Sequence, residues 1–148
     1  FFDNTDFIQT QDKLKASDKR IRAIIDNSPS LISLKDNGGR YLVANQAFCD
    51  FFEVDEHRIQ GKTDREIFPE ALANEFRDHD LEVLLKRASS EKQEIINFQG
   101  KDSVFLSNRF PLTVANERIP YAVGTVALNI TAQVRAQEEL KKSEQRYK

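Results

Sequence analysis

The segment that most constrains the fold lies at residues 31–45. Two strand-like runs, LISLKD and RYLVAN, flank the tripeptide Asn37-Gly38-Gly39. Asn and Gly tolerate the positive φ angles of a tight turn, so the pattern predicts an antiparallel hairpin. The core of the domain therefore begins with antiparallel sheet.

Three further runs have the short length and the β-branched and aromatic content of strands: QEIINF (93–98), SVFLSNRFPL (103–112) and IPYAVGTVAL (119–128). Between the hairpin and these runs lie helical patterns, one of them capped by Asn45 and a longer one over residues 70–88. The order predicts an α+β domain with one five-stranded antiparallel sheet and its helices grouped on one face.

Both ends of the chain have a helical pattern. Residues 6–26 contain neither Gly nor Pro, and apolar residues recur there every seven positions at Phe7, Leu14 and Ile21. These residues fill only one of the two apolar positions of a coiled-coil heptad. The pattern therefore predicts an amphipathic helix that packs either on its own domain or on a second copy. The tail from residue 130 repeats the pattern with Ala136, Leu140, Ser143 and Tyr147.

Composition narrows the class of protein. The 148 residues suit one domain, and a net charge of −2 gives no basic surplus for nucleic acid or anionic lipid. No apolar run approaches the roughly 20 residues of a membrane span.

The single cysteine, Cys49, excludes an intramolecular disulfide and fits a reducing compartment. We therefore expect a cytoplasmic domain that does not touch the membrane itself. Because the chain contains no Met, we expect a piece of a longer protein, whose other parts can carry a membrane anchor.

The chain resembles a PAS domain. The resemblance rests on IIDNSPSLISLKDNGGRYLVANQAFCDFF (24–52), on IQGKTDREIFP (59–69) and on NITAQVRAQEELKKSEQRY (129–147). It implies a sensor or relay module of a bacterial histidine kinase or diguanylate cyclase, with no catalysis in this segment. It also implies a parallel homodimer through the flanking helices and a downstream output domain in the same chain.

The implied division is a signalling helix at 1–26, a PAS core at 27–129 and a linker helix at 130–148. PAS domains often have Asp-Ile-Thr where this chain has Asn129-Ile130-Thr131. Asn keeps the hydrogen-bonding capacity of Asp and loses its charge. We expect Asn129 and Thr131 to couple the sheet to the exit helix.

His79 raises the question of a haem cofactor. In oxygen-sensing haem PAS domains the iron ligand is a His followed by Asp on this helix, which His79-Asp80 resembles, and imidazole is a suitable ligand for haem iron. Those sensors also use an Arg that here corresponds to Gln99 or Gly100. The default interpretation is therefore a hydrogen-bonded core or rim histidine, and no cofactor is the main expectation. A flavin–cysteine photosensor is not expected, because GKTDREIFP contains no Cys.

A small-molecule pocket between sheet and helices is a third possibility. Strand alternation, set by analogy with flavin-binding relatives, points six side chains inward: Asn97, Phe105, Ser107, Arg109, Val123 and Thr125. The helices add Phe48, Phe52, Phe76 and His79. Arg109 is expected to pair with an internal acid, Asp64 or Glu66, in preference to a ligand carboxylate. We find no catalytic or metal-binding constellation in the sequence.

The other face of the sheet is also apolar, with Val104, Leu106, Phe110, Val126 and Leu128. A sheet that is apolar on both sides needs cover on both, so we expect the flanking helices or a second subunit on this face. The alternative to a sensor is a ligand-free dimerisation module, in which the eleven Phe residues fill the core.

Overall fold

The structure is a computed structural model that describes residues 4–146, so Tyr147 of the predicted tail seam lies outside the described residues. The elements in chain order are α1 (Thr5–Asn27), β1 (Leu31–Asp36), β2 (Tyr41–Ala44), α2 (Gln46–Phe52), α3 (Glu56–Ile59), α4 (Asp64–Ile67), α5 (Glu70–Lys86), β3 (Ser90–Phe98), β4 (Lys101–Leu112), β5 (Ala122–Asn129) and α6 (Thr131–Arg146).

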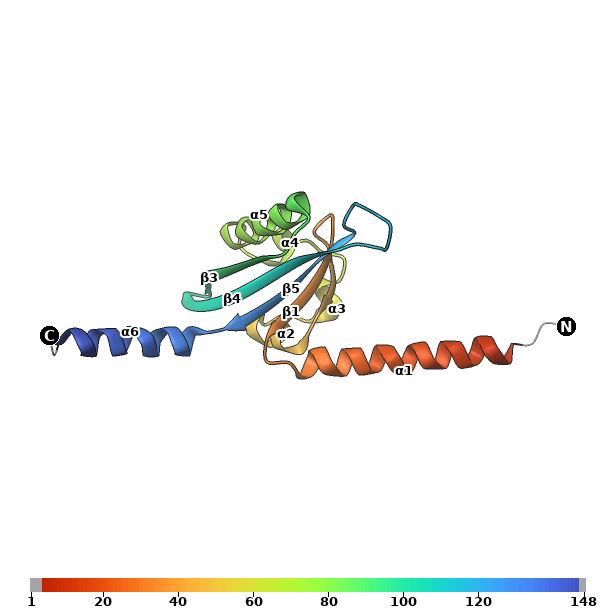
Figure 1. Cartoon of the computed structure of the whole chain (residues 1–148), viewed down its shortest axis with the longest axis horizontal. Helices are drawn as coiled ribbons and strands as arrows, with labels where there is room; N and C mark the ends of the chain where they lie inside the picture. The colour runs from red at the N-terminus through yellow and green to blue at the C-terminus, as the bar shows by residue number, and fades with distance from the viewer. Residues whose placement is uncertain (1–3, 147–148) are drawn as a thin grey trace.

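The five strands form one antiparallel sheet in the order β2-β1-β5-β4-β3. The predicted hairpin is confirmed, and Gly39 takes the positive φ of 86° that its turn requires. β4 and β5 lie near the centre, β3 is an edge strand, and α2 to α5 cover one face, which we call the inner face (Figure 1). The predicted α+β fold with a five-stranded sheet is therefore confirmed.

Local sequence explains how α2 begins. Asn45 caps the helix, since its side-chain oxygen accepts a hydrogen bond from the backbone N–H of Phe48 at 3.1 Å. The same oxygen accepts from the N–H of Ile32 in β1 at 2.9 Å. One buried Asn thus ties the hairpin to the first core helix.

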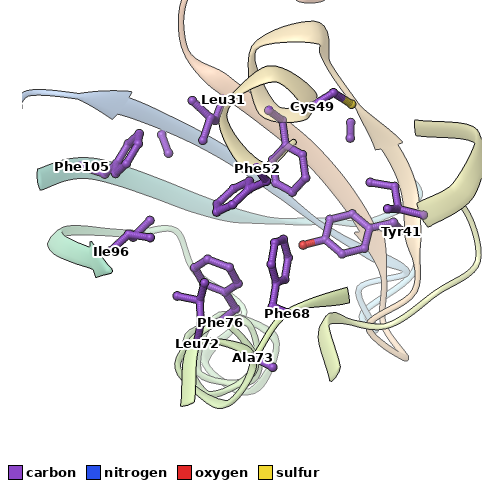
Figure 2. Close-up of a cluster of buried hydrophobic side chains, with 14 residues drawn as sticks. Leu31, Tyr41, Cys49, Phe52, Phe68, Leu72, Ala73, Phe76, Ile96 and Phe105 are labelled. Carbon is purple, nitrogen blue, oxygen red and sulfur yellow. The ribbon is translucent and has the colours of Figure 1, made fainter. Parts of the chain in front are cut away.

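Aromatic side chains fill the space between the helices and the inner face (Figure 2). The rings of Phe68 and Phe76 meet edge-on with centroids 5.5 Å apart, and Phe52 contacts both. Each fully buried Phe contributes about 1.5–3 kcal/mol through the area it removes from water. This cluster holds α2, α4 and α5 against the sheet.

The two flanking helices extend away from the domain in opposite directions (Figure 1). Among the described residues, neither α1 nor α6 contributes a buried side chain. The end of α1 is fixed where Arg22 forms an ion pair with Glu56 at 2.6 Å and Asn45 donates to the carbonyl of Ile25 at 2.6 Å.

The outer face of the sheet stays uncovered within residues 4–146. Leu128 is 43% exposed, and Val104, Leu106, Phe110 and Val126 are only half-buried. The expectation that the chain's own flanking helices lie on this face is wrong, because both helices project beyond the edges of the domain. Cover by a second subunit stays a prediction.

Candidate functional site

The inner face of the sheet holds a connected set of seven ionisable side chains, which we call the buried network. Its members come from six elements: Lys35 (β1), Tyr41 (β2), Asp64 (α4), His79 and Asp80 (α5), Glu94 (β3) and Arg109 (β4). Buried charges persist in proteins when oppositely charged or hydrogen-bonding partners surround them. The network therefore links every strand of the inner face except β5 to the helices above it.

Lys35 occupies one end of the network. It is 2% exposed, and its Nζ lies 2.9 Å from Asp64 Oδ2 and 2.5 Å from Asp80 Oδ2. The hydroxyl of Tyr41 donates to Asp64 Oδ1 at 2.5 Å. Burial raises the pKa of Tyr41 well above its ordinary value, and the Asp64 carboxylate raises it further, so this phenol is a hydrogen-bond donor.

Arg109 occupies the other end. Its Nε lies 3.1 Å from Asp80 Oδ1, and its Nη1 lies 2.8 Å from Glu94 Oε1. Asp80 thus bridges the two buried cations. The prediction that Arg109 pairs with internal acids is confirmed, but the predicted partners, Asp64 or Glu66, are wrong. Asp64 pairs with Lys35, and Glu66 is exposed.

His79 is 4% exposed, and both of its ring nitrogens are engaged. Nδ1 contacts Glu94 Oε1 at 2.6 Å and also Arg109, and Nε2 lies 3.3 Å from Ser90 Oγ. Burial tends to raise the pKa of Glu94, but the hydrogen bond with His79 and the charge of Arg109 lower it to about 2. His79 is therefore a hydrogen-bonded core residue in this structure.

A cavity of about 30 Å³ lies between the network and the phenylalanine cluster. It has room for one or two water molecules. Its walls are Leu31, Ser33, Lys35, Tyr41, Phe48, Phe52, Phe76, Glu94, Ile96, Ser107, Arg109, Thr125 and Ala127. The cavity is much smaller than a porphyrin, and iron ligation would require His79 to leave its partners, so the residues do not fit haem.

The structure brings six of the ten predicted pocket residues to the cavity wall: Phe48, Phe52, Phe76, Ser107, Arg109 and Thr125. His79, Phe105 and Val123 are buried nearby but do not line it. The inward orientation predicted for Asn97 is wrong. Asn97 is exposed and donates to Asp102 at 2.8 Å, and Ile96 takes the inward position.

Sequence reasoning missed most of the network. A signal for Lys35 was present, since alternation in LISLKD places it on the same face as Leu31 and Ser33. The inward position of Glu94 follows once Ile96 is assigned to the core. Nothing in the sequence pairs these groups with Asp80, because that contact depends on how α5 lies across the sheet.

Within residues 4–146, no group of His, Cys, Asp or Glu side chains is arranged to hold a metal ion. No helix in the same range has the length and apolar content to cross a bilayer.

A second site lies where β5 passes into α6, and we call it the exit joint. The N–H of Ile130 donates to the carbonyl of Val104 at 2.8 Å, and the N–H of Val104 donates to Thr131 Oγ1 at 2.9 Å. Asn129 Oδ1 accepts from the N–H and from the hydroxyl of Thr131, at 3.1 and 2.6 Å. β4, the strand between β5 and the edge strand β3, is thus hydrogen-bonded directly to the first residue of α6.

An α+β domain with this sheet order, a helix-covered inner face and a helix at each end has the architecture of a sensory domain. A sequence profile described as the PAS fold matches residues 25–135, which is most of the chain. The chain belongs to the PAS family.

Among curated proteins, the chain is similar to the virulence sensor protein BvgS of Bordetella bronchiseptica, with 35% identity over 85 residues. It is also similar to the methanogenesis regulatory histidine kinase FilI of Methanothrix harundinacea, with 32% identity over 72 residues. These matches cover 55% and 49% of this chain and only 6% and 8% of the two relatives. The chain is thus homologous to a PAS segment of much larger sensor proteins.

Solved structures give the same fold. The PAS domain from Bordetella pertussis BvgS superposes with a TM-score of 0.67 at 24% identity, over 86% of this chain and 98% of that one. A phage VqmA in complex with DPO superposes with a TM-score of 0.67 at 19% identity, over 90% of this chain and 62% of that one. At these identities the likeness establishes the fold alone.

Proposed function

We propose that this chain is a sensor or relay module that passes a signal from its inner face through α6 to an output domain in the same protein, either a histidine kinase or a diguanylate cyclase. In this proposal the residues up to 26 form an input helix, residues 27–129 form the sensing core, and the helix from residue 130 is the link to the output. The histidine kinase relative FilI supports the first kind of output.

The observation that carries the proposal is the exit joint. β4 supplies Arg109 and Ser107 to the cavity wall, and its Val104 bonds with both Ile130 and Thr131. A shift of β4 in response to a change at the cavity therefore displaces the start of α6. This is the kind of small displacement that packed elements transmit as a rotation or shift of a helix.

We also propose that two copies associate in parallel through the flanking helices. Phe7, Leu14 and Ile21 repeat every seven residues along α1 and are 58%, 60% and 57% exposed. A half-filled apolar seam of this kind gains stability by pairing with an identical seam. The ligand-free dimerisation module is the second candidate, and the small cavity and the phenylalanine cluster favour it.

Deletions in α6 test the relay. Removing seven residues (134–140) shortens the helix and keeps its seam in phase, whereas removing Gln137 alone turns the remainder by about 100°. We expect output activity of the parent protein to survive the first deletion and to be locked on or off by the second. Unchanged output after removal of Gln137 would contradict the relay.

Cysteine cross-linking tests the dimer. In a Cys49→Ala background, Leu14→Cys is expected to form a disulfide between identical positions under mild oxidation. Ala16→Cys, about half a turn round the same helix, is the matched control and is expected to cross-link far less. Equal cross-linking of the two variants would exclude a specific parallel seam.

A further inference from the structure

One ring nitrogen of His79 contacts two partners of opposite kind. Nδ1 lies 2.6 Å from Oε1 of Glu94, an atom that only accepts hydrogen bonds, and it also contacts Nη1 of Arg109, an atom that only donates them. A ring nitrogen carries either a hydrogen or a lone pair, so Nδ1 makes one of these two bonds at a time. His79 therefore has two alternative bonded states within the buried network.

The charge of the ring selects between these states. In the neutral ring with its hydrogen on Nε2, the lone pair of Nδ1 accepts from Arg109, and Nε2 faces Oγ of Ser90 at 3.3 Å. The charged ring has a hydrogen on both nitrogens, so Nδ1 can only donate to Glu94 and the bond with Arg109 is excluded. The other neutral tautomer also turns its N–H toward Glu94, but it lacks the attraction that a charged ring has for the carboxylate.

The charge balance of the buried network favours a further positive charge. Besides His79, the network holds three carboxylates and two cations, so it has one negative charge in excess while the ring is neutral. A proton on the ring balances the charges, and buried ions are least costly when each has an opposite partner. Arg109 opposes the charge of the ring, and its own carboxylate partners, Asp80 and Glu94, offset it. Glu94 stays ionised near neutral pH, because its pKa is about 2.

A hollow at the surface gives the ring a route to solvent protons. It lies between α5 and β3, has a volume of about 380 Å³ and has His79 on its wall. Its other charged side chains are four acids and one base: Glu75, Asp78, Glu82, Glu94 and Lys92. Nearby negative charges favour the charged form of a histidine. The hollow is thus suited to deliver a proton to a ring that is itself buried.

We propose that His79 is a proton-dependent switch, in which protonation moves Nδ1 from a bond with Arg109 of β4 to a bond with Glu94 of β3. The proton comes from solvent through the hollow and binds at the lone pair of Nδ1, while Nε2 keeps its hydrogen. In this switch the buried network binds a proton and no other ligand.

The switch connects to the exit joint through β4. Loss of the bond with His79 removes one of the contacts between Arg109 and α5. Val104, on the same strand, bonds with both Ile130 and Thr131 at the start of α6. The inference rests on the proposed relay through α6 and names a proton as one signal that sets its state.

NMR titration of the full chain between pH 8 and pH 5 tests the switch, since histidine changes its charge in this range. As the pH falls, we expect the ring nitrogens of His79 to move to the imidazolium position and the Nε–H resonance of Arg109 to shift with the same midpoint. A ring that keeps one charge throughout, or an Arg109 resonance that does not follow the ring, would overturn the switch.

The same titration separates the switch from the relay. The amide resonances of Val104 and Ile130, whose N–H groups bond within the exit joint, should shift with the midpoint of His79. If His79 and Arg109 titrate together and these two amides do not follow, the switch stands and the proposed relay fails.

Variants assign the titration to His79. His79→Gln keeps a side chain that donates and accepts hydrogen bonds but takes up no proton, so it should abolish the pH-dependent shift of Arg109. His57→Gln, at the exposed second histidine of the chain, is the matched control and should leave that shift unchanged. A shift that persists in His79→Gln would overturn the inference. Thermal unfolding verifies that each variant is folded, and the titration of the wild type decides the matter if His79→Gln is not.

Discussion

The two faces of the sheet differ in a way that inverts the usual distribution of polar and apolar residues. The inner face, packed under the helices, holds Lys35 and Arg109 at 2% and 3% exposure. The outer face, which no described element covers, exposes apolar side chains such as Leu128. Buried ionic groups are stable only when each has its partners, whereas leaving an apolar side chain in water costs a modest free energy per residue. The stability of the inner face therefore depends on specific ion pairs, and that of the outer face only on the apolar character of its side chains.

The largest effect is expected at Asp80, the carboxylate shared by both buried cations. Asp80→Ala leaves Lys35 paired with Asp64 and Arg109 paired with Glu94, so each buried cation keeps one carboxylate where it had two. Removing one member of a buried ion pair costs about 3–5 kcal/mol. We expect a loss within that range in the free energy of unfolding, measured by denaturant titration. Asp78→Asn, an exposed acid on the same helix, is the control and should leave stability unchanged. A small loss for Asp80→Ala would mean that water reaches the network.

Phenylalanines on opposite faces of β4 provide the next comparison. Phe105 is fully buried on the inner face, so Phe105→Ala should cost about 3–4 kcal/mol. Phe110 lies on the outer face directly across from Gly124, where the ring covers a position that has no side chain. Phe110→Ala should cost about 1 kcal/mol, as a cross-strand pair does. Equal losses would show that the outer face is covered in solution.

Acid should weaken the inner face through Glu94. Its pKa in the folded chain is about 2, below the ordinary value of 4.5, so its ionised form stabilises the fold above pH 4.5. That contribution, of the order of 2–3 kcal/mol, should be lost as the pH falls from about 4.5 to 2. The difference in unfolding free energy between the wild type and Glu94→Gln should shrink over this interval. Glu91→Gln, on the same strand and exposed, is the control.

The smallest effect is expected at Leu128. Leu128→Ala removes a side chain that is already 43% exposed, so it should cost less than about 1 kcal/mol. Leu31→Ala, at a residue of the inner face that is 7% exposed, should cost about 2–5 kcal/mol. If the two losses prove similar and the loss at Leu128 grows with protein concentration, a second copy covers the outer face.

Alternation and turn chemistry are local properties, and they were enough to predict the hairpin and the other three strands. Which side chains of β4 and β5 point inward was set by analogy with flavin-binding relatives, because alternation alone does not say which face is the inner one. They failed at Asn97 because two consecutive isoleucines, Ile95 and Ile96, make both registers of the edge strand plausible. They identified Arg109 as an inward residue but not its partners. Asp80 meets Arg109 only through the placement of α5 over β4, which is a tertiary property.

The exit joint has no formal charge, because Asn129 stands where PAS domains often have Asp. Contacts between ions at a protein surface weaken as salt is added, and hydrogen bonds between neutral groups do so far less. A signal carried across this joint should therefore have the same strength in dilute buffer and in concentrated salt.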